Sequence, residues 1–113
     1  MKADKTIIIP SNFNNKLACP IMQHLDLAPW TTIPESLMEK SVVEFQTADK
    51  SFPPTFWKLV DLYRLGTDQL SGAFTYPSHG MDACDFYQWL VKMYAETKDI
   101  TKLAIFCYKK IID

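Results

Sequence analysis

The segment SHGMDACDFYQWLVKMYAETKD, residues 78–99, brings a histidine, a cysteine, acids and aromatics together and decides how the fold is read. Asp82 stands where a helix N-cap belongs, and Asp85 favours the positive end of a helix. The apolar residues that follow recur at helical spacing: Phe86, Trp89, Leu90, Met93 and Tyr94. The spacing predicts one amphipathic helix over about residues 82–95, with this stripe facing the core.

The rest of the chain is dominated by short runs of β-branched and aromatic residues, which predict strands. These runs cover residues 5–9, 21–25, 41–47, 56–65 and 101–112, and short helical turns are expected at 14–18 and 35–40. The run 56–65 has apolar residues on both faces, which predicts a central strand. The closing run alternates, with Leu103, Ile105 and Cys107 on one face and Ala104, Phe106 and Tyr108 on the other.

Several short strands, proline-rich connections and one late helix predict an α+β fold. We expect a small curled β-sheet or partly open β-barrel of four to six strands, with one main helix in the C-terminal half and short helical turns. The chain has 113 residues, which fits a single domain over residues 1–113.

Composition and charge exclude several classes of protein. Hydrophobic residues make up 48% and aromatic residues 13% of the chain, which is too apolar for a disordered protein. The formal charge of −1 gives no overall attraction to a phosphate backbone, so DNA is not an expected partner. The isoleucine run 7–9 is too short for a signal peptide or a membrane span, which predicts a cytoplasmic protein without membrane contact. The odd number of cysteines predicts free, mostly buried thiols.

The order of elements from residue 56 to 112 resembles the second half of ASCH-type domains in the PUA-like superfamily. Gly80, Phe86 and Lys92 to Tyr94 stand where that pattern has a glycine, an aromatic near the helix start and KMY at the helix end. The resemblance implies a small barrel with a cleft for nucleotides or other small ligands.

In the first half of such domains, a GxK element and a strand rich in threonine and arginine line the cleft. This chain has NNKLACPIMQHL, with Asn15, Lys16 and His24 near the corresponding places but neither the glycine nor the arginine. Some family members hydrolyse modified cytidine with a threonine, a lysine and a glutamate, and this sequence does not match that set.

The candidate ligand-binding residues are Asn15, Lys16, His24 and Trp57. An amide-rich loop directly after the first strand can present donors and acceptors at a barrel mouth. Lys16 would supply a positive charge and His24 a ring that is partly protonated near neutral pH, so binding of an anionic ligand should weaken with salt. Trp57, or alternatively Trp30, would offer a stacking platform.

Two other constellations have simpler explanations. His79, Asp82, Cys84 and Asp85 are all zinc-ligand types, but helix capping accounts for both acids, and no metal or other cofactor is expected. Cys19 and His24 would form a nucleophile and base only with a third orienting group, so a buried histidine beside an inert thiol is favoured.

These observations predict a small cytoplasmic PUA/ASCH-like binding module for RNA, a nucleoside or a related small ligand, rather than an enzyme. A first alternative is a protein-interaction or regulatory domain without a small-molecule site. A second is a small amidohydrolase-like enzyme that uses Lys16 with a carboxylate such as Glu44. A basic cleft favours the binding module, an exposed apolar patch the interaction domain, and a lysine near a carboxylate and a hydroxyl the hydrolase.

Overall fold

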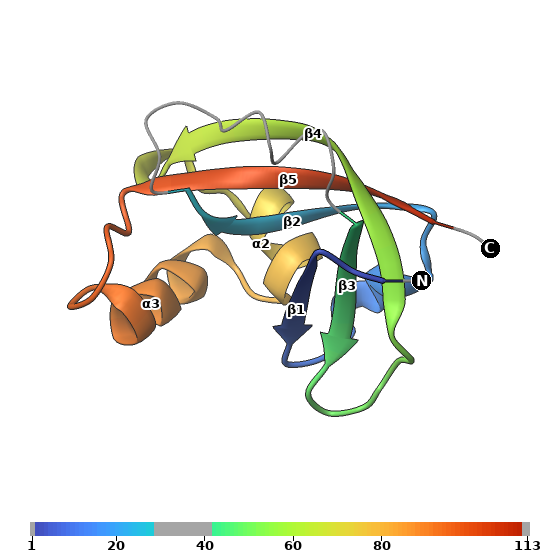
Figure 1. Cartoon of the computed structure of the whole chain (residues 1–113). Coiled ribbons are helices and arrows are strands. Elements are labelled where there is room, and N and C mark those ends of the chain that lie inside the picture. The colour runs from blue at the N-terminus through green and yellow to red at the C-terminus, as the bar shows by residue number, and fades with distance from the viewer. Residues whose placement is uncertain (1, 29–41, 112–113) are drawn as a thin grey trace.

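The computed structural model describes residues 2–28 and 42–111, and the helical turn expected at 35–40 lies outside them. The chain forms strands and short helices, and the two longer helices lie between the last two strands (Figure 1). The elements are β1 (Lys5–Ile9), the 3₁₀ helix η1 (Phe13–Ala18), β2 (Ile21–Leu27), β3 (Val42–Thr47), β4 (Thr55–Gly66), the 3₁₀ turn η2 (Thr67–Gln69), α2 (Gly72–His79), α3 (Ala83–Tyr94) and β5 (Lys102–Lys110).

The described strands form one mixed five-stranded sheet in the order β1-β3-β4-β5-β2. β1 runs parallel to β3, and the other neighbours are antiparallel. The sheet curls but does not close, because the two edge strands, β1 and β2, are not paired with each other. The predicted α+β class, the curled sheet and the central position of β4 are therefore confirmed.

β4 is the strand that curls the sheet. It begins beside β3 and bends over to run along β5 (Figure 1). Its register with β5 shifts between Leu59 and Asp61, and such a bulge bends a strand and increases its twist. The bulge also changes the alternation, so that Leu62 faces the same core as Trp57 and Leu59. Regular alternation along residues 56–65 predicts Leu62 on the opposite face together with Val60, and this prediction is wrong, since Leu62 is buried while Val60 is exposed.

The two faces of β5 contribute to two separate cores, as the alternation in the sequence predicted. Ala104, Phe106 and Tyr108 pack inside the curl of the sheet, where Leu17 of η1 also lies. Leu103, Ile105 and Cys107 face the other way, toward the helices. Strand β5 is thus covered on both sides, and its residues 103–108 are all buried.

Helix α3 matches the predicted helix in extent and in its N-cap. The Asp82 side chain accepts a hydrogen bond from the Asp85 backbone amide at 2.7 Å. Phe86 and Leu90 are buried against β5 and β2, as expected for the stripe. Met93, however, is 52% exposed, so the predicted stripe is wrong at this position.

Helix α2 was not predicted. Its sequence, GAFTYPSH, contains a glycine and Pro77, both of which disfavour a helix. Packing against β2, η1 and α3 overrides these propensities, and Thr75 and Ser78 are completely buried. Gly80 ends the helix in the left-handed conformation, with φ of 70°, which glycine adopts without steric cost.

Cys19, Cys84 and Cys107 are all free thiols, as predicted. Only Cys107 is buried, so the expectation of mostly buried cysteines is wrong for the other two. Among the described helices, none combines the length and the apolar character needed to cross a membrane.

Candidate functional site

The loop after β1 turns the chain so that Lys16 points into the protein. Asn14 and Asn15 both have positive φ, 53° and 56°, which asparagine tolerates better than most residues. The Asn12 side chain accepts a hydrogen bond from Leu17 N at 2.9 Å, and the Asn14 amide donates to the Tyr76 carbonyl. The asparagines therefore shape η1 and fasten it to α2.

Lys16 and His24, two of the predicted site residues, lie in contact. Lys16 Nζ is 3.0 Å from His24 Nδ1, and it donates a hydrogen bond of 2.7 Å to the backbone carbonyl of Ser78. The Lys16 side chain is 5% exposed and the His24 side chain 4%. One amine thus ties η1 to β2 and α2 in the interior of the protein.

A second histidine, His79 at the end of α2, completes the cluster. Ser78 Oγ accepts a hydrogen bond from Leu25 N at 2.7 Å, so its own hydrogen can be donated to His79 Nδ1, also at 2.7 Å. The rings of His24 and His79 stack with their centres 5.2 Å apart. The Lys16–His24–Ser78–His79 group is called the Lys/His cluster below.

Burial sets the charges of this cluster. It lowers the pKa of Lys16 from 10.5 to about 7, because little water remains to solvate an ammonium there. Burial, followed by repulsion from Lys16, lowers the pKa of His79 from 6.5 to about 4. The same two causes keep the pKa of His24 well below its usual value. Both imidazoles are therefore neutral at pH 7, and Lys16 is about half protonated.

Aromatic rings surround the His79 side of the cluster. The His79 ring centre lies 4.9 Å from that of Phe86 and 5.1 Å from that of Trp89, both on α3. Trp89 in turn meets Tyr94 edge to face at 5.8 Å. His24 meets Phe45 of β3 in the same manner at 5.4 Å.

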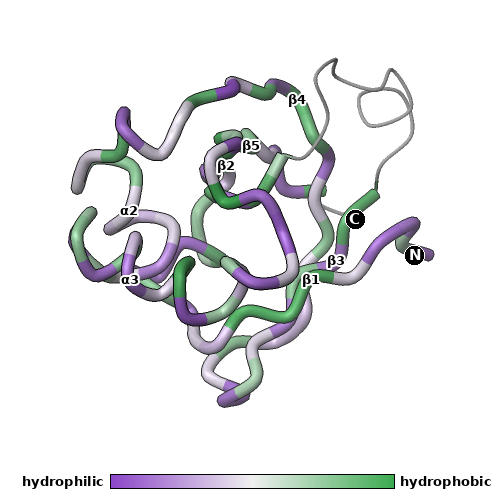
Figure 2. Tube along the Cα trace, turned by 90° about the vertical axis from the view of Figure 1, so that its left-hand side faces the viewer, coloured by the Kyte–Doolittle hydropathy of each residue, from purple (hydrophilic) through white to green (hydrophobic). Residues whose placement is uncertain are grey.

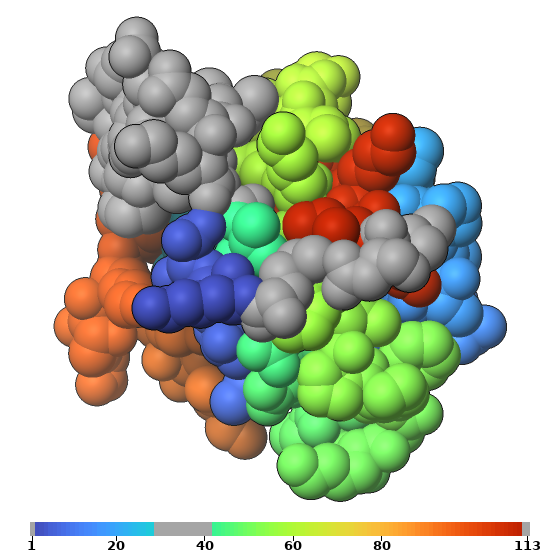
Figure 3. All heavy atoms as spheres, turned by 45° about the vertical axis from the view of Figure 1, so that its right-hand side comes forward, coloured from blue at the N-terminus to red at the C-terminus, as the bar shows by residue number. Residues whose placement is uncertain are grey.

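A cavity of about 320 Å³ opens between β1 and β2, the two edge strands that are not paired with each other, next to the Lys/His cluster. Its lining residues belong to β1 and the proline that follows it, to β2, to the end of α2 and to α3: Ile7, Ile8, Ile9, Pro10, His24, Asp26, His79, Trp89, Met93 and Tyr94. Figure 3 shows β1, in dark blue, directly beside the orange α3 region at the surface. Figure 2 shows that β1 is hydrophobic along most of its length. We call this space the edge cavity.

Three polar groups face the edge cavity. No second hydrogen bond is recorded for the ring of His24 or His79 within residues 2–28 and 42–111. Both rings line the cavity, and Nε2 is in each case the ring nitrogen that is not used in the contact with Lys16 or Ser78. Asp26 accepts a hydrogen bond from Leu27 N through Oδ1 at 2.7 Å, and burial raises the pKa of its carboxyl group.

No protein-family model matches the chain, and neither a curated protein nor a solved structure matches it. The conclusions about the site therefore depend on its own geometry.

The structure does not bring the other two predicted site residues to the Lys/His cluster. Asn15 is exposed on η1, where its side chain accepts a hydrogen bond from Asn12. The Trp57 ring is completely buried in the core, with its Nε1 donating to Thr55 Oγ1 at 2.8 Å. Stacking of a ligand on Trp57 would require this core to open. Trp30 lies outside the described residues.

The residues of the alternative hypotheses lie apart from one another. Glu44 accepts a hydrogen bond from Gln46, whereas the partners of Lys16 are His24 and Ser78. Cys19 is exposed, and its thiol lies 3.7 Å from the Asn15 carbonyl oxygen. Within the described ranges, no three His, Cys, Asp or Glu side chains lie together as a metal site would require.

Sequence reasoning missed Ser78, His79 and Asp26 as members of the site. His79 was considered only as a metal ligand, because no helix was predicted over residues 72–79. The glycine after His79 was the signal that could have identified it. A glycine commonly ends a helix in the left-handed conformation, so the histidine before it lies in the last turn of a helix and has a defined orientation.

Proposed function

We propose that this protein binds a small, uncharged, planar ligand of the size of a nucleobase or nucleoside in the edge cavity. The observation that carries the proposal is the pair of neutral histidines, His24 and His79, in the wall of an aromatic-lined cavity of about 320 Å³. Ligand pockets are commonly of this size, mostly apolar and supplied with a few convergent polar groups.

Stacking supports a planar ligand. Trp89 and Tyr94 contribute rings to the cavity wall, and His79 lies against Trp89. Stacking of a base on an aromatic side chain contributes about 1–3 kcal/mol and needs no charge on either partner. An unpaired base of an RNA would meet the same surfaces as a free nucleoside.

The electrostatics support an uncharged ligand. His24 and His79 are neutral at pH 7, and Asp26 is the acid among the lining residues. Because Nδ1 of each ring accepts a hydrogen bond from Lys16 or Ser78, Nε2 carries the hydrogen and can donate to a C=O group, while the Asp26 carboxylate can accept from an N–H group, which suits the edges of a base. A phosphate in the edge cavity would instead lie near the Asp26 carboxylate.

The test is a thermal-shift screen of nucleobases, nucleosides, nucleotides and short RNAs, followed by calorimetry of any hit. A ligand that binds only the folded state raises the melting temperature by mass action. We expect a nucleobase or nucleoside to raise it, with an affinity that changes less than about twofold between low and high salt.

The matched variants are His79→Phe, which keeps a ring but removes both nitrogens, and Lys92→Ala on the exposed side of α3. We expect His79→Phe to weaken binding at least about tenfold, the usual value of a lost buried hydrogen bond, and Lys92→Ala to change nothing. A melting temperature that no member of the panel raises would reject the proposal and favour the protein-interaction alternative. If only nucleotides bind, and their affinity falls strongly with salt, the ligand is charged and the proposal of an uncharged ligand is wrong.

A further inference from the structure

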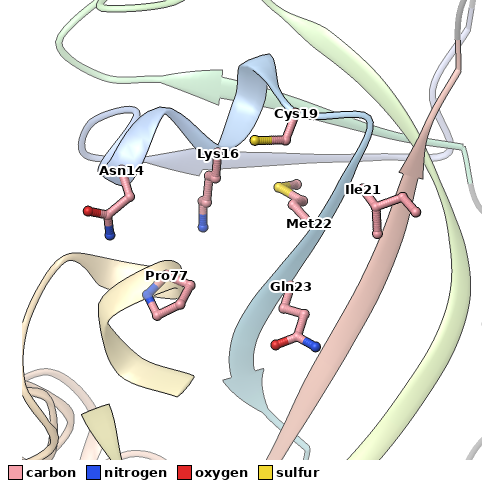
Figure 4. A pocket seen from close by; sticks show the side chains of 7 residues that line it. All are labelled: Asn14, Lys16, Cys19, Ile21, Met22, Gln23 and Pro77. Carbon is pink, nitrogen blue, oxygen red and sulfur yellow. The ribbon is translucent and has the colours of Figure 1, made fainter. Parts of the chain in front are cut away.

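A second cavity lies on the η1 side of the Lys/His cluster. Its volume is about 300 Å³, and Lys16, rather than a histidine, lines it. The other lining residues are mostly apolar or amide-bearing: Asn14, Cys19, Ile21, Met22, Gln23 and Pro77. Figure 4 shows the Lys16 side chain extending from η1 with its nitrogen directed between Pro77 and β2. We call this space the lysine cavity.

The surroundings of the Lys16 amine differ from those of an ordinary lysine. Its two hydrogen-bond partners, the Ser78 carbonyl and His24 Nδ1, are both uncharged at neutral pH. No carboxylate lies within salt-bridge distance of it in the described part of the chain, and none lines the lysine cavity. The hydrogen bonds to these uncharged groups do not replace the solvation that a buried ammonium loses, and the pKa of Lys16 falls to about 7. The neutral amine is therefore populated at pH 7.

The hydrogen bonds also orient the neutral amine. An –NH₂ group has two hydrogens, and these are used by Ser78 O and His24 Nδ1. Its lone pair then occupies the remaining tetrahedral direction, away from both partners. An amine that is unprotonated, fixed in direction and adjacent to an apolar cavity has the properties of a nucleophilic lysine.

We propose that Lys16 forms an imine with small uncharged aldehydes or ketones that enter the lysine cavity. The amine nitrogen attacks the carbonyl carbon, and one of its two hydrogens moves to the carbonyl oxygen, which becomes the hydroxyl of a carbinolamine. The second hydrogen passes through His24 Nδ1 to this hydroxyl, which leaves as water while the C=N bond forms. The products are the C=N bond and one water, so the step needs no oxidant or reductant.

The lining determines the class of carbonyl compound. Ile21, Met22 and Pro77 form apolar walls, while the amides of Asn14 and Gln23 can donate and accept hydrogen bonds but supply no charge. Lys16 is the only cation among the described residues that line this cavity, so a carboxylate on the substrate would have no second charged partner. A short aliphatic aldehyde such as butyraldehyde is small enough for the cavity and serves as the probe.

The experiment uses the wild-type protein with butyraldehyde and cyanoborohydride, which reduces an imine to a stable secondary amine. Peptide mapping by mass spectrometry then compares Lys16 with the exposed Lys92. At pH 7 an ordinary lysine, with a pKa near 10.4, has only about 0.04% of its amine unprotonated, against about half for Lys16. Allowing for restricted access, we expect Lys16 to be labelled at least about tenfold faster, with a rate that levels off above about pH 8.

Two controls make the result decisive. Lys16→Arg keeps a hydrogen-bond donor but has no primary amine, so fast labelling must disappear without moving to another lysine. Labelling of wild type in urea should make Lys16 and Lys92 react alike. Should Lys16 react no faster than Lys92 in the folded wild-type protein, the proposal is wrong, whatever the variants do. The nucleoside screen addresses the other cavity, so either proposal can fail while the other holds.

Discussion

At the scale of single residues, Lys16 determines how the site responds to pH. An ammonium held away from water loses much of its solvation, and this penalty appears as a pKa lowered from 10.5 to about 7. The unfolded chain keeps the ordinary pKa, so between these two values it binds more protons than the folded chain. The free energy of unfolding must therefore rise with pH in this window.

We predict that the free energy of unfolding increases by about 1.5 kcal/mol from pH 7 to pH 8.5. The window lies above the range in which the histidines act: the lowered pKa of His79 removes stability only as pH falls from 6.5 toward about 4. Urea denaturation at the two pH values measures the change. Lys16→Met fills a similar space without an ionisable group and should show no increase, and an increase equal to that of wild type would assign the effect to another residue.

The proximity of Lys16 and His24 could be predicted from the sequence, whereas the position of Trp57 could not. A polar loop after the first strand, followed by another strand, brings such residues together in a curled sheet. Trp57 was misplaced because a tryptophan suits both a ligand platform and a core, and only its neighbours on β3 and β5 decide between them. Its ring lies 6.4 Å from that of Phe45, and Lys110 Nζ lies 5.1 Å from its centre.

At the scale of elements, α3 shows how far helical periodicity can be used. Its stripe was correct for the first two turns, where the helix lies on β5 and β2. Near its C-terminal end the helix borders the edge cavity, where Met93 forms part of the rim. Periodicity identifies the apolar face of a helix but not where its packing partner ends.

The difference between the two ends of α3 is testable with two truncations. Leu90 is buried and Met93 is 52% exposed, on the same helix and with side chains of similar size. We predict that Leu90→Ala lowers the free energy of unfolding by about 2–5 kcal/mol, because it leaves a cavity, and that Met93→Ala lowers it by less than about 1 kcal/mol. Chemical denaturation of both variants measures this, and similar losses would contradict the assigned packing of α3.

Helix α2 and the bulge in β4 were missed for a common reason. Both depend on contacts with segments far away in the sequence, which local propensity does not contain. Pro77 and Gly72 disfavour a helix, yet burial of Thr75 and Ser78 against β2 and η1 outweighs this cost. The alternation through Val60 looks regular, and only the pairing of β4 with β5 shows the inserted residue.

At the scale of the whole molecule, the open side of the sheet is its most distinctive feature. An edge strand carries unpaired backbone groups that can pair with another chain. Here β1 has only five residues, carries a charged lysine at its start and is followed by Pro10, which has no backbone N–H to donate. Each of these features limits pairing with another chain. The two edges also form opposite walls of the edge cavity, so a ligand there would connect parts of the sheet that no strand pairing joins.

This arrangement predicts a specific pattern of amide hydrogen exchange. Buried β5, paired on both sides, should exchange slowest, while β1, paired only with β3, should open locally at a lower free energy.

A nucleoside bound in the edge cavity contacts β1, β2 and α3 together, so it should slow exchange most in residues 7–9 and much less in β5, whose exchange already requires unfolding of the core. Exchange measured by mass spectrometry with and without the best nucleoside of the screen tests this, with His79→Phe as the control that should lose the effect. Protection centred on η1 and residues 21–23 would instead place the ligand in the lysine cavity, and uniform protection would indicate stabilisation of the whole fold from a different site.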